Sequence, residues 1–280
     1  MIRTRYAPTP SGYLHFGNLY SFILTATVAR KVGAEILLRI DDMDMQRSRP
    51  EYLQGIYDCL RFFDLPWKKD LLQSKRLPLY QKALEELRRK HLVFACTCSR
   101  SMQQLKGQHG CVSDCSSRNI SLDAPQVNWR FRTADRLITI KEYNGDVVQK
   151  PVPASLRHWV VRKKDGLPAY QLCSVVDDGE LGIDLVIRGE DLWGSTIAQV
   201  ELSLHLDTHP LANTHFLHHP LILDQEGKKL SKSDGADSLY RLRREGHSAP
   251  EILSLLARLI TGNALPVQHW TDFEEILPLS

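Results

Sequence analysis

Two short polar segments, far apart in the chain, carry residue types that could handle a nucleoside triphosphate. His15-Phe16-Gly17-Asn18 stands between an expected strand and an expected helix. A helix N-terminus there would offer free backbone N–H groups and a dipole that favours anions, and Gly17 would let a nucleotide approach the backbone closely. The second segment, Lys229-Leu230-Ser231-Lys232-Ser233, supplies ammonium groups that could stabilise charge developing on phosphates.

Four of the six cysteines lie within twenty residues of one another. They form the pattern Cys96-x-Cys98 followed by Cys111-x-x-x-Cys115. Four thiolates in two close pairs fit a closed, tetrahedral Zn²⁺ site of the structural type, and His109 is an alternative ligand. The alternative interpretation is a set of reduced cysteines in a loop, some of them buried. The two other cysteines, Cys59 and Cys173, have apolar neighbours and are expected in the core.

The spacing of apolar residues indicates an α/β fold that could position these side chains. Residues 3–7 and 34–40 have strand patterns on either side of a helical pattern at 18–30, and such a βαβ unit predicts a parallel sheet. Strands at 159–162 and 185–188 are expected to resume that sheet. Further helices are expected at 50–63, 78–91, 169–176, 195–206 and 249–261.

In the segment between the two halves of this fold, strands and helices no longer alternate. Residues 127–131 alternate apolar and polar side chains, which is typical of a half-buried strand. Asn144-Gly145, with strand patterns on both sides, predicts a β-hairpin. The expected organisation has four parts: the first half of the α/β domain at 1–95, an insertion with the cysteines at 96–153, the second half at 154–223, and a lysine-containing loop with a helical region at 224–280.

Composition narrows the class of protein further. A chain of 280 residues with 42% hydrophobic and 25% charged residues is typical of an ordinary globular protein. It contains no apolar run long enough to span a bilayer and no export signal, so a cytoplasmic location without membrane association is expected. The net charge of +3 does not indicate nucleic acid. Basic clusters at 88–90, 157–164 and 228–244 could contact phosphates, unless they are solvated surfaces.

The two polar segments resemble the two ATP-handling signatures of class I aminoacyl-tRNA synthetases. Arg5-Tyr6-Ala7-Pro8-Thr9-Pro10-Ser11-Gly12, ahead of the first, narrows the resemblance to the glutamyl/glutaminyl branch. The full class signature has a second His where this chain has Asn18, a position that often varies in that branch. The resemblance covers nearly the whole chain. It implies a Rossmann-like parallel-sheet catalytic domain, an inserted zinc-binding and acceptor-binding subdomain, and ATP with Mg²⁺.

The resemblance also implies roles for single residues. The implied catalytic residues are His15, Lys229 and Lys232. The implied ATP-binding residues are His15, Gly17, Asn18, Glu190, Lys229 and Lys232. The implied glutamate-binding residues are Arg5, Thr9, Asp41, Tyr170 and Arg188. Asp41 stands where the family usually has Glu, so a shifted site or an altered amino acid are both open. The implied zinc ligands are Cys96, Cys98, Cys111 and Cys115.

Within this family the chain resembles the truncated glutamyl-queuosine tRNA(Asp) synthetases, because 280 residues leave no room for an anticodon-binding domain. That resemblance implies activation of glutamate as an adenylate and transfer to queuosine in the anticodon loop of tRNA(Asp), by a monomer. Three alternatives stay open. They are charging of a tRNA 3′ end by a stand-alone core, an amino-acid ligase for a carrier protein or small molecule, and a non-catalytic paralogue.

Overall fold

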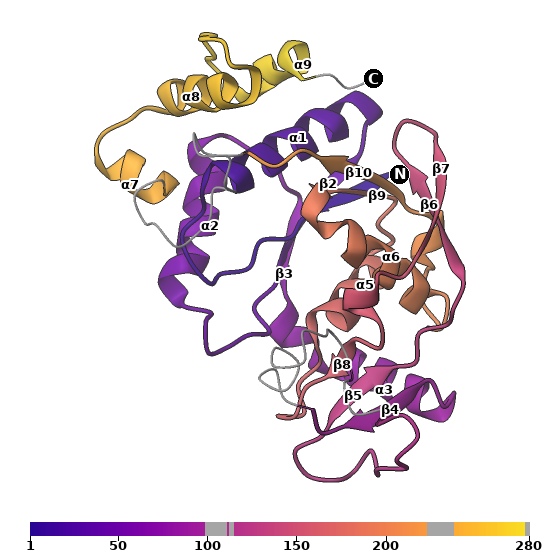
Figure 1. Cartoon of the computed structure of the whole chain (residues 1–280). Coiled ribbons are helices and arrows are strands. Elements are labelled where there is room, and N and C mark those ends of the chain that lie inside the picture. Colours follow the sequence, from indigo (N-terminus) through magenta and orange to yellow (C-terminus); the bar gives the residue numbers. More distant parts are fainter. Residues whose placement is uncertain (99–110, 112–114, 223–237, 278–280) are drawn as a thin grey trace. The chain divides into compact units, whose positions relative to one another are not determined.

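The computed structural model describes residues 1–98, 111, 115–222 and 238–277, and Figure 1 shows the chain from end to end. The chain divides into two compact units. The first contains Met1–Ser74, Leu185–Asp191 and Leu217–Ser280. The second contains Lys75–Asp184 and Leu192–Phe216. The four-part division expected from the sequence stays a prediction. None of the described helices combines the length and the apolar character needed to cross a membrane.

The first unit begins with the predicted βαβ arrangement. Its elements are β1 (Arg3–Tyr6), α1 (Phe16–Val32), β2 (Glu35–Ile40) and β3 (Lys69–Leu72). The strands lie in the order β1-β2-β3, and all neighbours run parallel. Helix α1 ends at Gly33, whose left-handed φ of 66° closes the helix at little cost for glycine. Buried Leu19, Ile23 and Ala26 hold α1 against the core.

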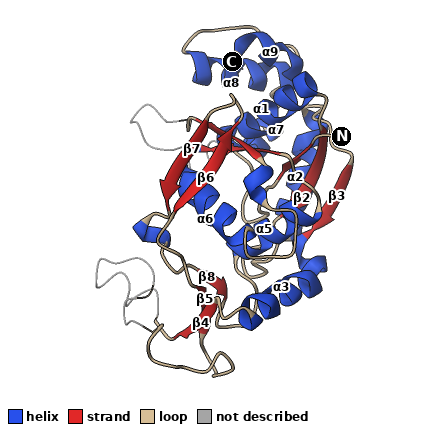
Figure 2. Cartoon of the chain, turned by 90° about the vertical axis from the view of Figure 1, so that its right-hand side faces the viewer, coloured by secondary structure: helices blue, strands red, loops and turns tan. Residues whose placement is uncertain are grey.

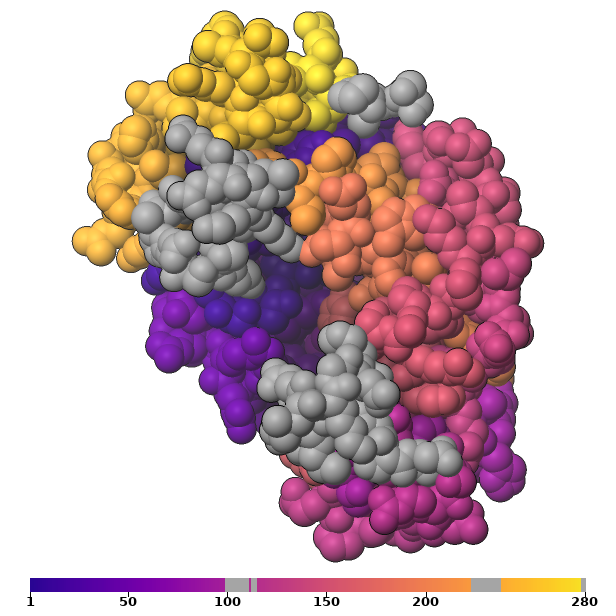
Figure 3. All heavy atoms as spheres, viewed as in Figure 1, coloured from indigo at the N-terminus to yellow at the C-terminus, as the bar shows by residue number. Residues whose placement is uncertain are grey.

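The rest of the first unit consists of one helix that precedes β3 and of elements from the second half of the chain. Its elements are α2 (Pro50–Phe62), β9 (Leu185–Gly189), α7 (Leu239–Arg244), α8 (Ala249–Thr261) and α9 (Phe273–Ile276). Strand β9 contacts β1 and α1, while α7 contacts α2 and α9 contacts α1. The indole N–H of Trp270 donates to the Asp64 carbonyl at 3.0 Å, which joins segments 206 positions apart. Figure 3 shows the gold and yellow residues of α7 to α9 as one continuous surface.

The second unit contains an antiparallel sheet that was only partly expected. Its strands β4 (Val93–Cys96), β5 (Asn128–Phe131) and β8 (Val160–Arg162) lie in the order β4-β5-β8, together in Figure 2. The prediction that 159–162 resumes the parallel sheet is therefore wrong. The rings of Phe131 and Trp159 pack at 5.0 Å, so burial against β5 decides the pairing. A short apolar run does not specify its partner.

The predicted hairpin is confirmed. It consists of β6 (Leu137–Glu142) and β7 (Val147–Pro151), and Gly145 in its turn has a left-handed φ of 94°. Lys141 and Glu142 at the end of β6 also pair in parallel with the start of β10 (His215–His219), a pairing that the sequence does not predict. The α-helices of this unit among the described residues are α3 (Leu77–Arg89), α5 (Tyr170–Glu180) and α6 (Trp193–Ser203).

Candidate nucleotide, amino-acid and metal sites

The first turn of α1 fixes the His15 imidazole through two reciprocal hydrogen bonds. The backbone N–H of Gly17 donates to Nδ1 of His15 at 3.1 Å, and the backbone N–H of His15 donates to Oδ1 of Asn18 at 3.1 Å. These bonds form a capping box, which satisfies two N–H groups that a helix start otherwise leaves without partners. Because Nδ1 accepts, a neutral imidazole must carry its proton on Nε2. The site thus has a defined donor at the positive end of the helix dipole.

The structure gives a second reason why glycine stands at position 17. A Cβ atom at this position would lie 3.0 Å from Cε1 and 3.1 Å from Nδ1 of His15. Most real Cβ contacts are longer, so a larger residue would force the ring to shift by a few tenths of an ångström. Glycine therefore serves the histidine as well as any ligand that approaches the backbone.

The two flanks of residues 223–237 contact this region of the first unit. On the downstream side, Ser238 forms an isolated antiparallel bridge with His15, and the N–H of Leu239 donates to the Leu14 carbonyl at 2.9 Å. On the upstream side, the N–H of Leu221 donates to Oε1 of Glu190 at 3.4 Å. The predicted residues Lys229 and Lys232 lie outside the described residues. The flanks of their segment nevertheless reach two of the predicted ATP-binding residues, His15 and Glu190.

Asp41 lies in a buried ion pair that the sequence analysis missed. Nε and Nη2 of Arg39 donate to the two carboxylate oxygens of Asp41 at 2.7 and 3.2 Å, and both side chains are at most 5% exposed. The Asp41 charge is therefore already balanced by a guanidinium. Binding of an amino group by Asp41 stays a prediction. A cation and an anion two positions apart at the end of an apolar strand could have indicated this pair, because such residues face the same side.

The neighbouring carboxylate, Asp42, has a different set of partners. Its Oδ1 accepts from the backbone N–H of Ser74 at 2.8 Å, and its Oδ2 accepts from the Ser74 hydroxyl at 2.6 Å. Asp42 thus joins the end of β2 to the chain after β3. Asp41 therefore binds the Arg39 guanidinium, whereas Asp42 binds the backbone and hydroxyl of Ser74.

The predicted glutamate-binding residues are only partly brought together. Arg5 on β1 and Arg188 on β9 are buried, and their strands contact each other within the first unit. Thr9 follows β1 in the same unit, where its carbonyl accepts from the N–H of Ser11 at 2.9 Å. Tyr170 begins α5 in the second unit and is 45% exposed. Its approach to the other residues stays a prediction.

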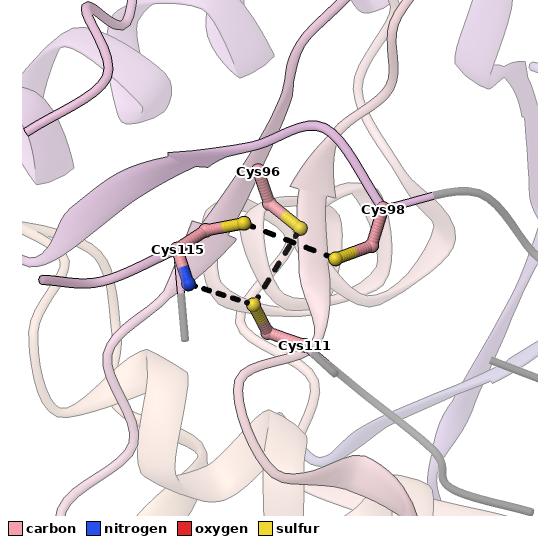
Figure 4. Close-up of side chains that lie close together, drawn as sticks. All are labelled: Cys96, Cys98, Cys111 and Cys115. Carbon is pink, nitrogen blue, oxygen red and sulfur yellow. Dashed lines mark hydrogen bonds between the residues drawn. The ribbon is translucent and has the colours of Figure 1, made fainter. Parts of the chain in front are cut away.

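The four clustered cysteines converge in the second unit, as Figure 4 shows. The Sγ atoms of Cys96 and Cys111 are 3.7 Å apart, and those of Cys98 and Cys115 are 3.8 Å apart. All four sulfur atoms lie within 4.8 Å of one another. Four sulfurs at 2.3 Å from a tetrahedral Zn²⁺ would be separated by about 3.8 Å. The cluster therefore has the dimensions of a four-thiolate metal site.

The surroundings of the cluster explain why a metal suits it. Phe94, Ile120 and the cysteines themselves form a small apolar core around the sulfurs. Burial raises the pKa of the Cys96 thiol to about 12, so a thiolate there needs a nearby positive charge. A bound cation supplies that charge. Both cross-cluster sulfur distances are far longer than a disulfide bond, and the cysteines are free thiols. His109 lies outside the described residues.

Comparison with known proteins shows the family of the chain. A curated relative named glutamyl-Q tRNA(Asp) synthetase, from Parasynechococcus marenigrum (strain WH8102), is 38% identical over 91% of this chain and 82% of its own length. A protein named glutamate–tRNA ligase 2, from Acidiphilium cryptum (strain JF-5), is 35% identical over 92% of this chain. The chain spans only 61% of that second relative.

Solved structures and a family model agree on the fold. The crystal structure of a glutamate tRNA ligase from Elizabethkingia meningosepticum CCUG26117, in complex with its amino acid, has a TM-score of 0.76 at 22% identity. It covers 98% of this chain, which corresponds to 64% of the solved chain. The model that describes the catalytic domain of class I tRNA synthetases (E and Q) matches residues 1–265. The chain therefore belongs to the class I tRNA synthetase family of the E and Q type, through its catalytic domain.

Proposed function

We propose that this chain activates glutamate with ATP and transfers it to queuosine in the anticodon loop of tRNA(Asp). The observation that carries the choice of acceptor is the 38% identity to a protein named glutamyl-Q tRNA(Asp) synthetase, over 91% of this chain and 82% of that protein. The imidazole fixed at the start of α1 supports the nucleotide chemistry, because an anion at that place meets a helix N-terminus and a defined donor.

In the proposed first step, the α-carboxylate of glutamate attacks the α-phosphate of ATP, and pyrophosphate leaves. Nε2–H of His15 donates to a phosphate oxygen, and the ammonium groups of Lys229 and Lys232 stabilise charge that grows in the transition state. Gly17 and Asn18 keep the helix start open to the nucleotide and its cap in place. Glu190 would contact the ribose. Mg²⁺ bound with ATP would neutralise phosphate charge.

In the proposed second step, a hydroxyl of the queuosine cyclopentene diol attacks the adenylate carbonyl, and AMP leaves. Arg5 and Arg188 would bind glutamate carboxylates, for which the planar guanidinium fork is suited. Thr9, Asp41 and Tyr170 would complete the amino-acid site. The protein acts here by positioning and electrostatics, and no side-chain nucleophile is needed.

The cysteine cluster is proposed to bind one structural Zn²⁺ through Cys96, Cys98, Cys111 and Cys115. The four sulfur positions leave no open coordination place for a substrate, so the ion would hold the chain together near β4 and would take no part in either chemical step. The predictions of a monomer and of a cytoplasmic location also belong to this proposal.

The test of the acceptor uses four preparations of tRNA(Asp): with and without queuosine, each with and without its 3′-terminal adenosine. Trimming the 3′ end removes the adenosine to which a synthetase attaches an amino acid, and it leaves the queuosine diol intact. We expect labelled glutamate on both queuosine-containing samples and on neither of the others. Label that requires the terminal adenosine and ignores queuosine would overturn the proposed acceptor.

That second outcome would establish the second candidate function, glutamylation of a tRNA 3′ end. A specific observation favours it: relatives named glutamate–tRNA ligase are 32% to 36% identical over 92% to 99% of this chain. The activation step has its own test. His15→Ala should lower glutamyl-adenylate formation by about 10²–10³-fold, the usual cost of losing one charge-stabilising donor. His15→Ser keeps an acceptor for the N-cap but is too short to replace the donor, so it should be equally slow.

A further inference from the structure

A stack of tyrosines stands on the surface of the first unit, apart from the roles proposed above. The rings of Tyr13 and Tyr240 lie parallel, with centroids 4.1 Å apart and an interplanar angle of 7°. Tyr52 meets Tyr13 edge-on at 5.1 Å and 85°. The three side chains come from the loop before α1, from α7 and from α2, so distant parts of the sequence build this stack.

The stack is held rigidly by its supports. The Ser238 hydroxyl caps α7 by accepting from the backbone N–H of Arg241 at 3.2 Å. The guanidinium of Arg243 lies over the ring of Phe62 at 4.7 Å and so seats α7 on α2. A Cβ atom at Gly55 would lie 3.4 Å from Cδ1 of Tyr13, which places the backbone of α2 against that ring. Tyr13 is therefore enclosed between α2 and Tyr240.

The outer member of the stack, Tyr240, is exposed, and arginines lie beside it and beside Tyr52. Tyr240 is 38% exposed. The exposed Arg244 lies with its guanidinium carbon 5.9 Å from the Tyr240 centroid, and Arg49 lies 5.9 Å from the Tyr52 centroid. Arg49 has one carboxylate near it, that of Glu51 at 3.8 Å, but both side chains are at least half exposed. Such a pair is weak in water and can exchange for a phosphate.

We propose that Tyr240 is a stacking platform for an unpaired RNA base, with Arg244 and Arg49 contacting the phosphates beside it. This inference rests on the proposed function, in which the substrate is an RNA loop, and it adds a place where that loop is held. A base on Tyr240 would extend the Tyr13–Tyr240 stack by one layer. Unpaired bases stacked on aromatic rings and flanked by guanidinium groups are the common mode of single-stranded RNA recognition.

The chemistry favours an unpaired base over a duplex. Bases inside a duplex already stack on both faces, so they present no free face to Tyr240. Phosphates alone would be served by the arginines and would need no ring. A rigid, exposed ring that is backed by a second ring loses little side-chain entropy on binding, and this lowers the cost of recognition.

The experiment measures binding of a 12-nucleotide single-stranded RNA with a 3′-phosphate and one 2-aminopurine, by fluorescence anisotropy and by quenching of the 2-aminopurine. The same sequence as a duplex is the comparison. This oligonucleotide carries neither queuosine nor a terminal diol, so it cannot accept glutamate. Failure of glutamate transfer to tRNA would therefore leave this result intact, and failure of the platform would leave the transfer result intact.

We expect Tyr240→Leu to weaken binding of the single strand by about tenfold and to abolish the quenching, since one stacked base is worth ~1–3 kcal/mol. Tyr240→Phe keeps the ring face and should bind within about twofold of the unchanged protein. Arg244→Gln should weaken binding and reduce the slope of log K against log salt by about 0.7, the effect of one lost phosphate contact. Arg258→Gln on α8 removes another exposed arginine and is the matched control for charge.

Unchanged affinity in Tyr240→Leu would overturn the platform, as would equal binding of the duplex or equal losses in the Phe and Leu variants. Absence of measurable binding to the single strand would also overturn it. Thermal unfolding of each variant checks that α7 is still seated. If Tyr240→Leu fails this check, the salt slopes of Arg244→Gln and Arg258→Gln decide, and equal slopes would contradict the proposal.

Discussion

The start of α1 and the cysteine cluster are both candidate ligand sites, but they are built in opposite ways. His15, Gly17 and Asn18 lie within four residues and satisfy one another through two hydrogen bonds of 3.1 Å. The cysteines span residues 96 to 115. Their sulfurs make weak contacts at 3.7 and 3.8 Å, and the backbone N–H of Cys115 donates to Sγ of Cys111 at 3.2 Å. The first site forms these two hydrogen bonds without a ligand. The second gathers buried thiols that gain strong bonds only when a cation is present.

This difference predicts which of the two sites stays ordered when its ligand is absent. A capping box forms with the helix itself, so the nucleotide site should be preorganised in the free protein. The thiol cluster has a hydrogen bond within its Cys111–Cys115 pair but only weak sulfur contacts between that pair and Cys96–Cys98 among the described residues, so the approach of the two pairs should depend on the ion.

Cys98→Ser should produce the largest effect, because it removes one of four ligands from the proposed metal site. We expect the bound zinc to fall from about one per chain to almost none, and the free energy of unfolding to fall by more than ~4 kcal/mol, as is usual when a structural metal is lost. Metal analysis and chemical denaturation measure both quantities. Cys59→Ala, at a buried cysteine outside the cluster, should keep the metal. Equal zinc content in both variants would contradict the role of Cys98 as a metal ligand.

Asp41→Asn tests whether the first unit has internal restraints near its proposed amino-acid site. The substitution leaves the buried Arg39 guanidinium without its bidentate carboxylate, so we expect a loss of about 3–5 kcal/mol in unfolding free energy. Urea denaturation is the measurement. Asp44→Asn is the matched control, because its ion pair with Arg47 at 2.6 Å is exposed and should be worth under ~1 kcal/mol. Similar losses in the two variants would contradict a structural role for the Asp41 pair.

Gly17→Ala tests whether the nucleotide site depends on the place of the His15 ring. The new Cβ would lie 3.0 Å from Cε1 of His15 and would displace the imidazole. We expect a rise of about tenfold in the KM for ATP, since small misplacements of a binding group are costly. If the ring is the cause, the same substitution made in His15→Ala should have almost no further effect, which a double-mutant cycle measures. Additive effects would locate the clash with the nucleotide instead.

Glu201→Gln should have the smallest effect and concerns the second unit away from the cysteines. Burial raises the pKa of Glu201, whose Oε1 accepts from the backbone N–H of Ala134 at 2.9 Å, while Arg136 partly opposes the shift. The folded state therefore favours the protonated form and binds more protons than the unfolded chain above its ordinary pKa of 4.5, so stability falls as pH rises through that region.

Glutamine keeps the acceptor and cannot ionise. We expect Glu201→Gln to be more stable at neutral pH, by something on the order of 1 kcal/mol, and to lose this part of the pH dependence. Denaturation at several pH values between 4 and 8 measures it. A pH dependence that is unchanged in the variant would remove Glu201 as its source. A confirmed change would show that the second unit has restraints that do not depend on the cluster.

Much of the site at α1 could be predicted from the sequence, because its causes are local. The strand before it, the helix start and the side chain of Asn18 all lie within a few positions of His15. The reciprocal capping bonds, and the closeness of the ring to Gly17, needed atomic geometry. The clustering of the four cysteines was indicated by their spacing, but the paired distances near 3.8 Å depend on how β4 and the loop before β5 approach each other.

Elements whose signals are short in range were predictable from the residues alone: the βαβ start, the hairpin with its Asn144-Gly145 turn and the helix at 249–261. The motifs that carry the family resemblance are equally local. Only the tertiary structure decided the partners. It paired β8 with β5, joined Arg39 to Asp41, and stacked Tyr240 on Tyr13. The physical reason is that periodicity and capping involve residues a few positions apart, whereas a buried strand, charge or ring can satisfy itself with many partners, and only the packing of the whole unit selects one.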